Sequence, residues 1–234
     1  MNKKKLIVNA DDLGQSGGIN KGIIMAHEEG IVTSASLMVR YPSTKDAAAY
    51  AKMNPTLGVG LHIDLGEWIF RNGDWSALYE LVPLDDIKAV EAEIDHQLET
   101  FYRIMGRKPT HIDSHQHVHQ RESLRPVFTN LARKLDITLR ACGSHVKYCG
   151  DFYGQLADGS PFHSAISVDG LCRIISSIPG EITELACHPG LQDDIETMYR
   201  KEREIELNTL CDIAVRELIS DTAIELCTFE GISF

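Results

Sequence analysis

The most constraining feature of this chain is an alternation of short apolar segments with longer amphipathic ones, which runs through all 234 residues. The apolar segments have the length of buried β-strands, and the amphipathic ones have helical periodicity. Such alternation predicts a parallel sheet with helices outside it, because each pair of parallel strands needs a long crossover connection. Since the chain has no internal repeat, linker or break in composition, we expect one domain that spans residues 1–234.

The expected elements follow from this periodicity and from the residues that end each segment. The expected strands are Lys5–Ala10, Thr33–Val39, Leu57–Ile63, Pro109–Ser114, Ile137–Ala141, Ile182–Cys187 and Ala223–Thr228. The expected helices are Gly18–Glu29, a segment to Lys52 with Ser43 as N-cap, Leu84–Met105 closed by Gly106, Ser123–Leu135 with Pro126 in its first turn, Val168–Ser177 and Ile195–Leu218. Two stretches, Leu65–Pro83 and Gly143–Pro161, are expected to be irregular.

Polar residues gather at or just past the C-terminal ends of several expected strands. They are Asp11, Asp12, His62, Asp64, Asp113, His115, Arg140 and His188. Barrel active sites are built at that face from several strands, whereas an open doubly wound sheet gathers its site near one switch point. The expected fold is therefore an α/β single-domain distorted (β/α) TIM-like barrel of about seven parallel strands.

The densest group of polar residues is the run from Thr110 to His119, which holds four of the ten histidines. Imidazole is the commonest metal ligand in proteins because it is neutral near pH 7 and offers a nitrogen lone pair. Alternation along a strand would place His111 and Asp113 on one face, with His115 if the strand continues. His115, His117 and His119 cannot all reach one ion without a bent backbone, so at least two of them are expected to support a ligand, to contact substrate or to be structural.

Two further strand ends carry residues of the same types. Asp11 and Asp12 directly follow an apolar strand, so one carboxylate could bind a metal while the other serves as a base, although a capping or turn role is the alternative. His62 ends a strand that contains glycines, which suggests close approach of backbone or ligand, and Asp64 lies two residues beyond it. Three such strand ends together could supply the ligands of a mononuclear metal centre.

Two more charged residues are candidates for the same site. His188 precedes a Pro-Gly turn and could act as a general acid, or could simply be a turn histidine. Arg140 lies inside an apolar strand, where a charge is costly unless it is paired with a carboxylate. Asp11 is a plausible partner for it, and a plain structural ion pair is the alternative.

The composition limits the partners and the location. The net charge of −11 and the pI near 5.3 argue against binding to nucleic acid or to an anionic membrane. No apolar run approaches the roughly 20 residues that a membrane span needs, and no signal peptide is expected. Six cysteines without a CxxC pair fit free thiols in a reducing cytosol, so a cytoplasmic protein is expected.

The candidate residues suit hydrolysis of an amide or ester. Two histidines and a carboxylate with open positions are a frequent catalytic metal arrangement, and such an ion polarises a carbonyl and lowers the pKa of bound water. A nearby carboxylate would take the water proton, and an acid would protonate the leaving amine. The sequence has no P-loop that competes with this interpretation. Aromatic residues of the expected loops, such as Trp68, Trp75, Tyr79 and Tyr153, would suit sugar rings.

Five segments in order along the chain resemble one known family, the YdjC-like carbohydrate deacetylases. They are Val8–Gly14, Gly30–Val39, Gly60–His62, Gly106–His119 and the Cys187–Gly190 turn. The family includes chitooligosaccharide deacetylases and hopanoid-associated sugar deacetylases. The resemblance implies a distorted barrel and a metal-dependent hydrolase that removes acetyl groups from N-acetylated sugars, with metal-bound water as the nucleophile. It also implies one divalent ion per chain, with magnesium or zinc as candidates, and a possible homodimer.

The resemblance assigns roles residue by residue. Asp12, His62 and His115 correspond to the metal ligands of the family, and Asp11 to its general base. His188 resembles the general acid, and Arg140 would orient or tune Asp11. The connection after His62 departs from the family pattern, which puts chitooligosaccharide specificity in doubt.

Two other functions remain open at this point. One is a metal-dependent hydrolase of a different amide or of a phosphoester, although no basic phosphate pocket is evident in the sequence. The other is a non-catalytic protein that binds sugar or metal, which would keep the ligands but lack a base and an acid. The presence of Asp11 and His188 counts against it.

Overall fold

An eight-stranded parallel sheet forms the centre of the computed structural model, which describes residues 3–143, 145–191 and 197–232. Its strands are β1 (Lys4–Leu13), β2 (Ser34–Leu37), β3 (Gly58–Ile63), β6 (His111–Ser114), β7 (Thr138–Leu139), β8 (Lys147–Cys149), β9 (Ile182–Cys187) and β10 (Ile224–Leu226). Their order is β7-β6-β3-β2-β1-β9-β8, and β10 pairs with the beginning of β1. All strand pairs in this sheet are parallel, so the strands end at one common face.

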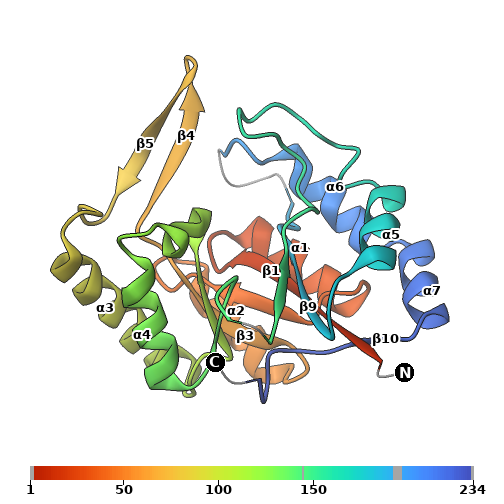
Figure 1. The fold of residues 1–234 in the computed structure, drawn as a ribbon, viewed down its shortest axis with the longest axis horizontal. Coiled ribbons are helices and arrows are strands. Elements are labelled where there is room, and N and C mark those ends of the chain that lie inside the picture. The colour runs from red at the N-terminus through yellow and green to blue at the C-terminus, as the bar shows by residue number, and fades with distance from the viewer. Residues whose placement is uncertain (1–2, 144, 192–196, 233–234) are drawn as a thin grey trace.

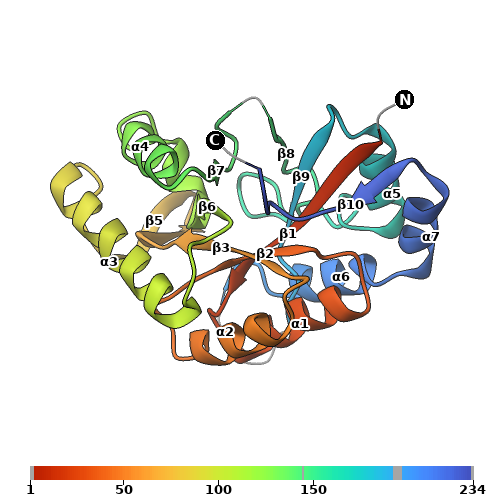
Figure 2. The ribbon, with the colours of Figure 1, turned by 90° about the horizontal axis from the view of Figure 1, so that it is seen from below.

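The helices lie around the outside of this sheet, which curls into a partial barrel (Figures 1 and 2). They are α1 (Gly17–Glu28), α2 (Thr44–Met53), α3 (Ile87–Met105), α4 (Arg125–Leu135), α5 (Val168–Ser177), α6 (Lys201–Leu210) and α7 (Ile213–Asp221). Apolar residues of strands from β1 to β9 and of the helix faces that cover them form one continuous core. The predicted α/β fold, a distorted TIM-like barrel, is confirmed.

The residues predicted to end one helix and to begin another also agree with the structure. Gly106 closes α3 with φ of +74°, a left-handed conformation that glycine adopts without strain. Pro126 lies in the first turn of α4. Ser43 occupies the N-cap position of α2, but its side chain makes no capping hydrogen bond.

The stretch Leu65–Pro83, predicted to be irregular, instead forms an antiparallel hairpin of β4 (Gly66–Arg71) and β5 (Asp74–Glu80). This hairpin stands clear of the main sheet (Figure 1). Asn72 and Gly73 join its strands, both with positive φ, as a two-residue hairpin turn requires. The Asn-Gly pair was a usable sequence signal, but β5 is mostly exposed and lacks the apolar alternation on which the prediction relied.

Two other predictions were wrong in part. The predicted loop Gly143–Pro161 contains β8, which is too short to show a periodicity and gains its hydrogen bonds from β9. The predicted helix Ile195–Leu218 is divided into α6 and α7, because Asp212 turns the chain and its carboxylate caps the N-terminus of α7. The first residues of that prediction lie outside the described part of the chain.

None of the helices in the described ranges is long and apolar enough to cross a membrane. All six cysteines are free thiols.

Candidate metal and active site

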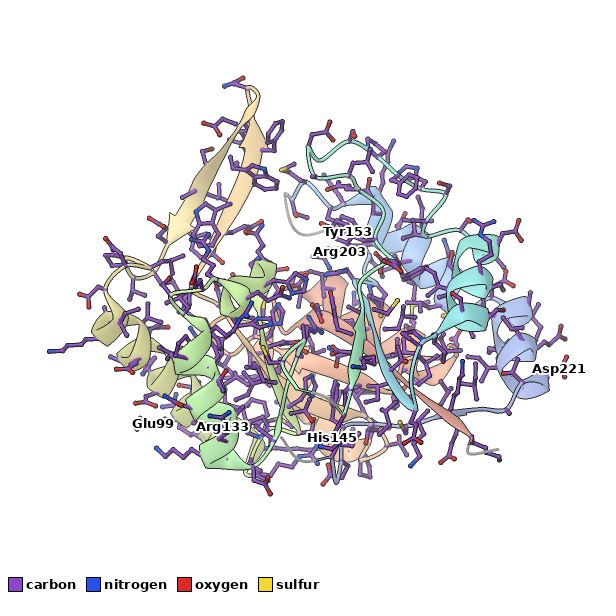
Figure 3. The ribbon with its side chains drawn as sticks, in the orientation of Figure 1. Glu99, Arg133, His145, Tyr153, Arg203 and Asp221 are labelled. Atoms are coloured by element: carbon purple, nitrogen blue, oxygen red, sulfur yellow. The ribbon has the colours of Figure 1, made fainter. Side chains whose placement is uncertain are left out.

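A cavity of about 530 Å³ lies at the C-terminal ends of the strands, between the β4–β5 hairpin and the segment that leads into α6. Asp11, Asp12, His62, His115 and His188 all line it, as the barrel prediction requires. Tyr153 and Arg203, which also line the cavity, lie at this end of the molecule (Figure 3). The cavity therefore gathers five of the six predicted site residues, and the sixth, Arg140, lies directly behind Asp11.

A β-bulge at the end of β1 controls where the two neighbouring aspartates point. Between the pairs Ala10–Ala35 and Leu13–Leu37, β1 contains one more residue than β2. Asp12 takes up this extra residue with φ of +67°, in the left-handed region that aspartate tolerates better than most residues. Because of the bulge, the side chains of Asp11 and Asp12 both reach the cavity instead of alternating across the strand.

The side chains of Asp12, His62 and His115 converge on one point. One ligand atom from each residue lies within 4.8 Å of the others. Oδ1 of Asp12 is 3.3 Å from Nε2 of His62 and 3.1 Å from Nδ1 of His115. Asp113 fixes the tautomer of His62, because Nδ1 of the ring donates a 2.7 Å hydrogen bond to the carboxylate of Asp113, so that the lone pair of the neutral ring lies on Nε2.

The chemistry of this group fits a divalent ion. Within the described residues, Nε2 of His62 and Nε2 of His115 are buried and have no hydrogen-bond partner. A buried polar atom without a partner is costly, and two imidazole nitrogens beside a carboxylate oxygen match the donors that zinc and similar ions prefer. Oδ2 of Asp12 is already taken, since Arg203 donates a 2.6 Å hydrogen bond to it.

The charges around the group favour a cation. Burial opposes ionisation of Asp12, but Arg203 and the two histidines outweigh it and hold the pKa of Asp12 well below its ordinary value. Burial disfavours a charged His62, yet Asp113 and Asp12 raise its pKa well above the ordinary value. The pKa of His115 is also raised, because Asp12 outweighs its burial. Without an ion, His62 and His115 bind protons more readily than free histidine does, because the neighbouring carboxylates attract positive charge.

Arg140 is fully buried at the centre of three carboxylates. Its Nη1 and Nη2 donate 2.6 Å hydrogen bonds to the two oxygens of Asp11, and Nη2 also lies 2.8 Å from Asp113. Its Nε donates a 2.6 Å hydrogen bond to Glu184 on β9. Burial raises the pKa of Glu184 to about 7, so this third acid carries a proton for much of the time near neutral pH. The predicted pairing of Arg140 with Asp11 is therefore observed, as one part of a larger network.

His188 lies just after β9 with its ring beside Asp11. Its Nε2 is 3.7 Å from Oδ2 of Asp11, and its Nδ1 is 3.9 Å from Oε1 of Glu206. Burial lowers the pKa of His188 to about 4, so the ring is neutral at neutral pH. Glu206 accepts hydrogen bonds from the backbone N–H of His188 and from the hydroxyl of Tyr199, and burial raises its pKa to about 8.

Arg203 and Glu206 are the site residues that the sequence analysis missed, because they lie in a segment treated only as a charged helix. Their spacing with Leu207 and Leu210 places all four on one face of α6, and all four are buried. Charged residues at the apolar positions of a helix were the available signal. They indicate side chains that are paired inside the protein.

The other residues of the histidine-rich run have separate environments. His111 is buried against Gly60, where a Cβ would meet its ring, and it stacks on Phe229. His117 lines the cavity and contacts the hydroxyl of Tyr148, while His119 bonds to Ser114 behind the site. Burial lowers the pKa of His111 and His117 to about 4 and that of His119 to about 3. All three rings are neutral. His111 and His119 have structural contacts, and His117 lies beside the cavity, as expected for part of the run.

The backbone bends sharply within this run. A 3₁₀ turn, η1 (His115–Gln120), follows β6, and Gln116 and His117 have φ of +48° and +54°. The bend lets His115 face the ion-binding group while the carboxamide of Gln116 bonds to Trp68 of the hairpin.

Asp64 does not join the ion-binding group, although it lies two residues from His62. Its carboxylate accepts hydrogen bonds from Arg40, Tyr41 and Tyr79 at the base of the hairpin. Asp64 therefore anchors β5 to the barrel and supports the hairpin that forms one wall of the cavity.

The fold and the site define a known class of protein. The chain belongs to the YdjC-like protein family, whose model matches residues 5–221. It is 34% identical to a carbohydrate deacetylase of Brevibacillus brevis, over 97% of this chain and 99% of the relative. It is 31% identical to a chitooligosaccharide deacetylase of Escherichia fergusonii, over 97% of this chain and 98% of the relative.

Solved structures show the same architecture. A protein of Enterococcus faecalis V583, provisionally described as a cellobiose-phosphate cleavage protein, superposes with a TM-score of 0.77 at 27% identity, over 99% of this chain and all of that chain. A family 4 carbohydrate esterase of Streptomyces lividans in complex with acetate matches with a TM-score of 0.52 at 12% identity, over 97% and 92% of the two chains. At that identity the second likeness concerns the fold alone.

Proposed function

We propose that this protein is a metal-dependent hydrolase that removes the acetyl group from N-acetylated sugars. The observation that carries the proposal is the convergence of Asp12, His62 and His115 at the base of the cavity, with Asp11 and His188 beside them. The names of the relatives, carbohydrate deacetylase and chitooligosaccharide deacetylase, support the same reaction and substrate class.

Asp12, His62 and His115 would hold the ion, with zinc or magnesium as candidates. When bound, it would polarise the acetamido carbonyl and lower the pKa of a coordinated water. Asp113 keeps the proton of His62 on Nδ1, and Arg203 keeps Oδ2 of Asp12 occupied, so one nitrogen and one oxygen remain directed at the same point. Both partners orient ligands and do not bind the ion themselves.

Asp11 is the proposed general base. Burial opposes its negative charge, but Arg140 outweighs burial and lowers the pKa of Asp11, so the carboxylate is ionised at neutral pH. The two hydrogen bonds from Arg140 also fix the orientation of this carboxylate. The same hydrogen bonds make Asp11 a weaker base, so a proton that it accepts is passed readily to a neighbouring group.

His188 is the proposed proton donor to the leaving amine. Because the ring is neutral at neutral pH, it must gain a proton before it can donate one. Oδ2 of Asp11 lies 3.7 Å from Nε2 of His188, so the proton that Asp11 accepts from water can pass to His188 and from there to the nitrogen of the broken amide bond. Glu206 accepts a hydrogen bond from the backbone N–H of His188 and so holds the residue that carries this ring in place.

Acetate release from N-acetylglucosamine and N,N′-diacetylchitobiose tests the proposal. Protein stripped with a chelator and reloaded with single metals should release acetate only when an ion is bound. Asp11→Asn should lower kcat by roughly 10²–10⁴-fold, whereas Asp85→Asn, a change at an exposed acid, should leave it unchanged. Stoichiometric ion binding without acetate release from any N-acetyl sugar would contradict the proposal and direct the search to other amides and esters.

A further inference from the structure

Both tryptophans of this chain lie in the β4–β5 hairpin and line the cavity. Trp75 on β5 has 50% of its surface exposed and meets Phe70 edge-on, with 5.7 Å between the ring centres. The hairpin stands clear of the main sheet (Figure 1). Trp75 lines the cavity and does not belong to the hydrophobic core. An aromatic ring held in this way is open to a ligand.

The hairpin is held in a fixed place relative to the ion-binding group. The carboxamide of Gln116 accepts a 2.8 Å hydrogen bond from the backbone N–H of Trp68 and donates a 2.8 Å hydrogen bond to its carbonyl. Gln116 directly follows His115, and the guanidinium of Arg121 lies 5.0 Å above the ring of Trp68. The left-handed backbone of Gln116 costs conformational energy, which this double hydrogen bond helps to offset. The turn that positions a proposed ligand therefore also positions the aromatic wall.

A second aromatic wall lies across the cavity. Tyr153 has 39% of its surface exposed, stacks on Tyr199 at 4.5 Å and meets the ring of His188 edge-on at 5.5 Å. The backbone N–H of Phe70 lies 3.2 Å from Sδ of Met198, so the hairpin touches the segment that carries Tyr199. Two aromatic walls therefore line the cavity. Tyr153 lies beside the proposed proton donor, and Trp75 lies on the wall that the hairpin forms.

Sugar rings match such walls, because they have apolar C–H faces and hydroxyl groups at their edges. An aromatic face packs against the C–H face, while the hydroxyls keep contact with water and polar side chains. The cavity volume of about 530 Å³ lies within the range of pockets that enclose a whole ligand and exceeds what an acetamido group needs. One ring at His188 and Tyr153 leaves the wall formed by Trp75 for a second ring.

We propose that Trp75 determines specificity by stacking on the sugar ring next to the one that is deacetylated, so that the preferred substrates contain at least two rings. This inference rests on the proposed deacetylase function, but it concerns a separate set of contacts. Gln116 and Arg121 act as positioning residues for the wall, through Trp68.

Intrinsic fluorescence tests the contact without turnover, since the chain has only two tryptophans and both line the cavity. Chelator-stripped protein should show a saturable change in tryptophan emission with N,N′-diacetylchitobiose, at concentrations where N-acetylglucosamine has no effect. A Trp68→Phe variant, which leaves Trp75 as the only indole, should keep this response. Equal responses to the two sugars, or no response to either, would overturn the proposal.

Steady-state kinetics give a second, independent measurement. Trp75→Ala should lower kcat/KM for the disaccharide about tenfold, the loss expected for one aromatic contact, and leave the value for the monosaccharide within twofold. Leu78→Ala is the matched control, because Leu78 lies on the same strand with 49% of its surface exposed but does not line the cavity. An equal loss for both sugars, or a loss for neither, would contradict a specific role of Trp75.

The two proposals can fail separately. If no sugar releases acetate but the disaccharide alone changes the emission of Trp75, the second-ring contact stands and the deacetylase function fails. If both sugars release acetate with equal kcat/KM and the emission does not change, the deacetylase function stands and the contact of Trp75 with a second ring fails.

Discussion

Arg203 donates a 2.6 Å hydrogen bond to Oδ2 of Asp12 from a helix 191 residues further along the chain. The contact leaves only Oδ1 of Asp12 facing His62 and His115. It also contributes most to keeping Asp12 ionised against the effect of burial. Arg203 therefore orients Asp12, a proposed ligand, and keeps it ionised.

Replacement of Arg203 tests whether its hydrogen bond to Asp12 contributes to ion binding. Arg203→Met should lower the affinity for a divalent ion by roughly 10–100-fold, because Asp12 loses the partner that fixes its orientation. Equilibrium dialysis against zinc, with a competing chelator, measures the change. Lys201→Met, an exposed position on the same helix, is the control and should keep the affinity of the unaltered protein. An unchanged affinity in Arg203→Met would show that Asp12 is held by its other neighbours.

Ion binding should release protons. His62 and His115 both have raised pKa values in the ion-free protein, and each must be neutral to offer a lone pair to a metal. Near neutral pH, we therefore expect at least one proton to leave per ion bound, and the apparent affinity should fall as the pH is lowered. Calorimetric titrations with zinc, in buffers of different ionisation enthalpy, count the protons. Binding without proton release would mean that these histidines are already neutral.

Loss of Arg140 should destabilise the fold. Arg140→Met would leave Asp11, Asp113 and Glu184 buried without their shared cation, and we expect a loss of about 3–5 kcal/mol in the free energy of unfolding. Urea denaturation of chelator-treated protein measures it. Arg173→Met, which removes an exposed cation from α5, should cost less than about 0.5 kcal/mol. A similarly small loss in Arg140→Met would mean that the three acids take up protons at little cost.

Glu206 should make the protein less stable as the pH rises. Its pKa is raised by burial from 4.5 to about 8, so between these values the folded state holds a proton that the unfolded state has released. The free energy of unfolding therefore falls as the pH increases through this window. Glu206→Gln carries no charge, so its stability should decline less steeply from pH 5 to pH 8 in urea titrations. Glu225→Gln, an exposed control, should keep the slope of the unaltered protein, and an equal slope in Glu206→Gln would refute the assignment.

The barrel core was predictable because its strands are buried on both faces and show as apolar runs. The run that ends at Ala10 and the run that ends at Cys187 were placed closely enough to put the residues after them at one face. The β4–β5 hairpin and β8 were missed for the opposite reason. The hairpin is mostly exposed, and the three residues of β8 are fixed as a strand by pairing with β9.

The gathering of Asp11, Asp12, His62, His115 and His188 in one cavity was likewise predictable, since parallel strands end at the same face. Their roles, the single domain, the cytoplasmic location, the homodimer and the identity of the ion stay predictions. The exclusion of Asp64 was not predictable, because two residues of the same parity can separate once the strand has ended.

The sequence by itself determined the core strands, most of the helices around them and the strand ends from which the polar residues project. These features depend on local periodicity, which any short window of the chain contains. Only the tertiary structure decided which oxygen of Asp12 faces the two histidines, which acids share Arg140 and where the indole of Trp75 stands. Those choices arise where charges and rings from distant segments of the chain meet, and their energies depend on distances that no local pattern encodes.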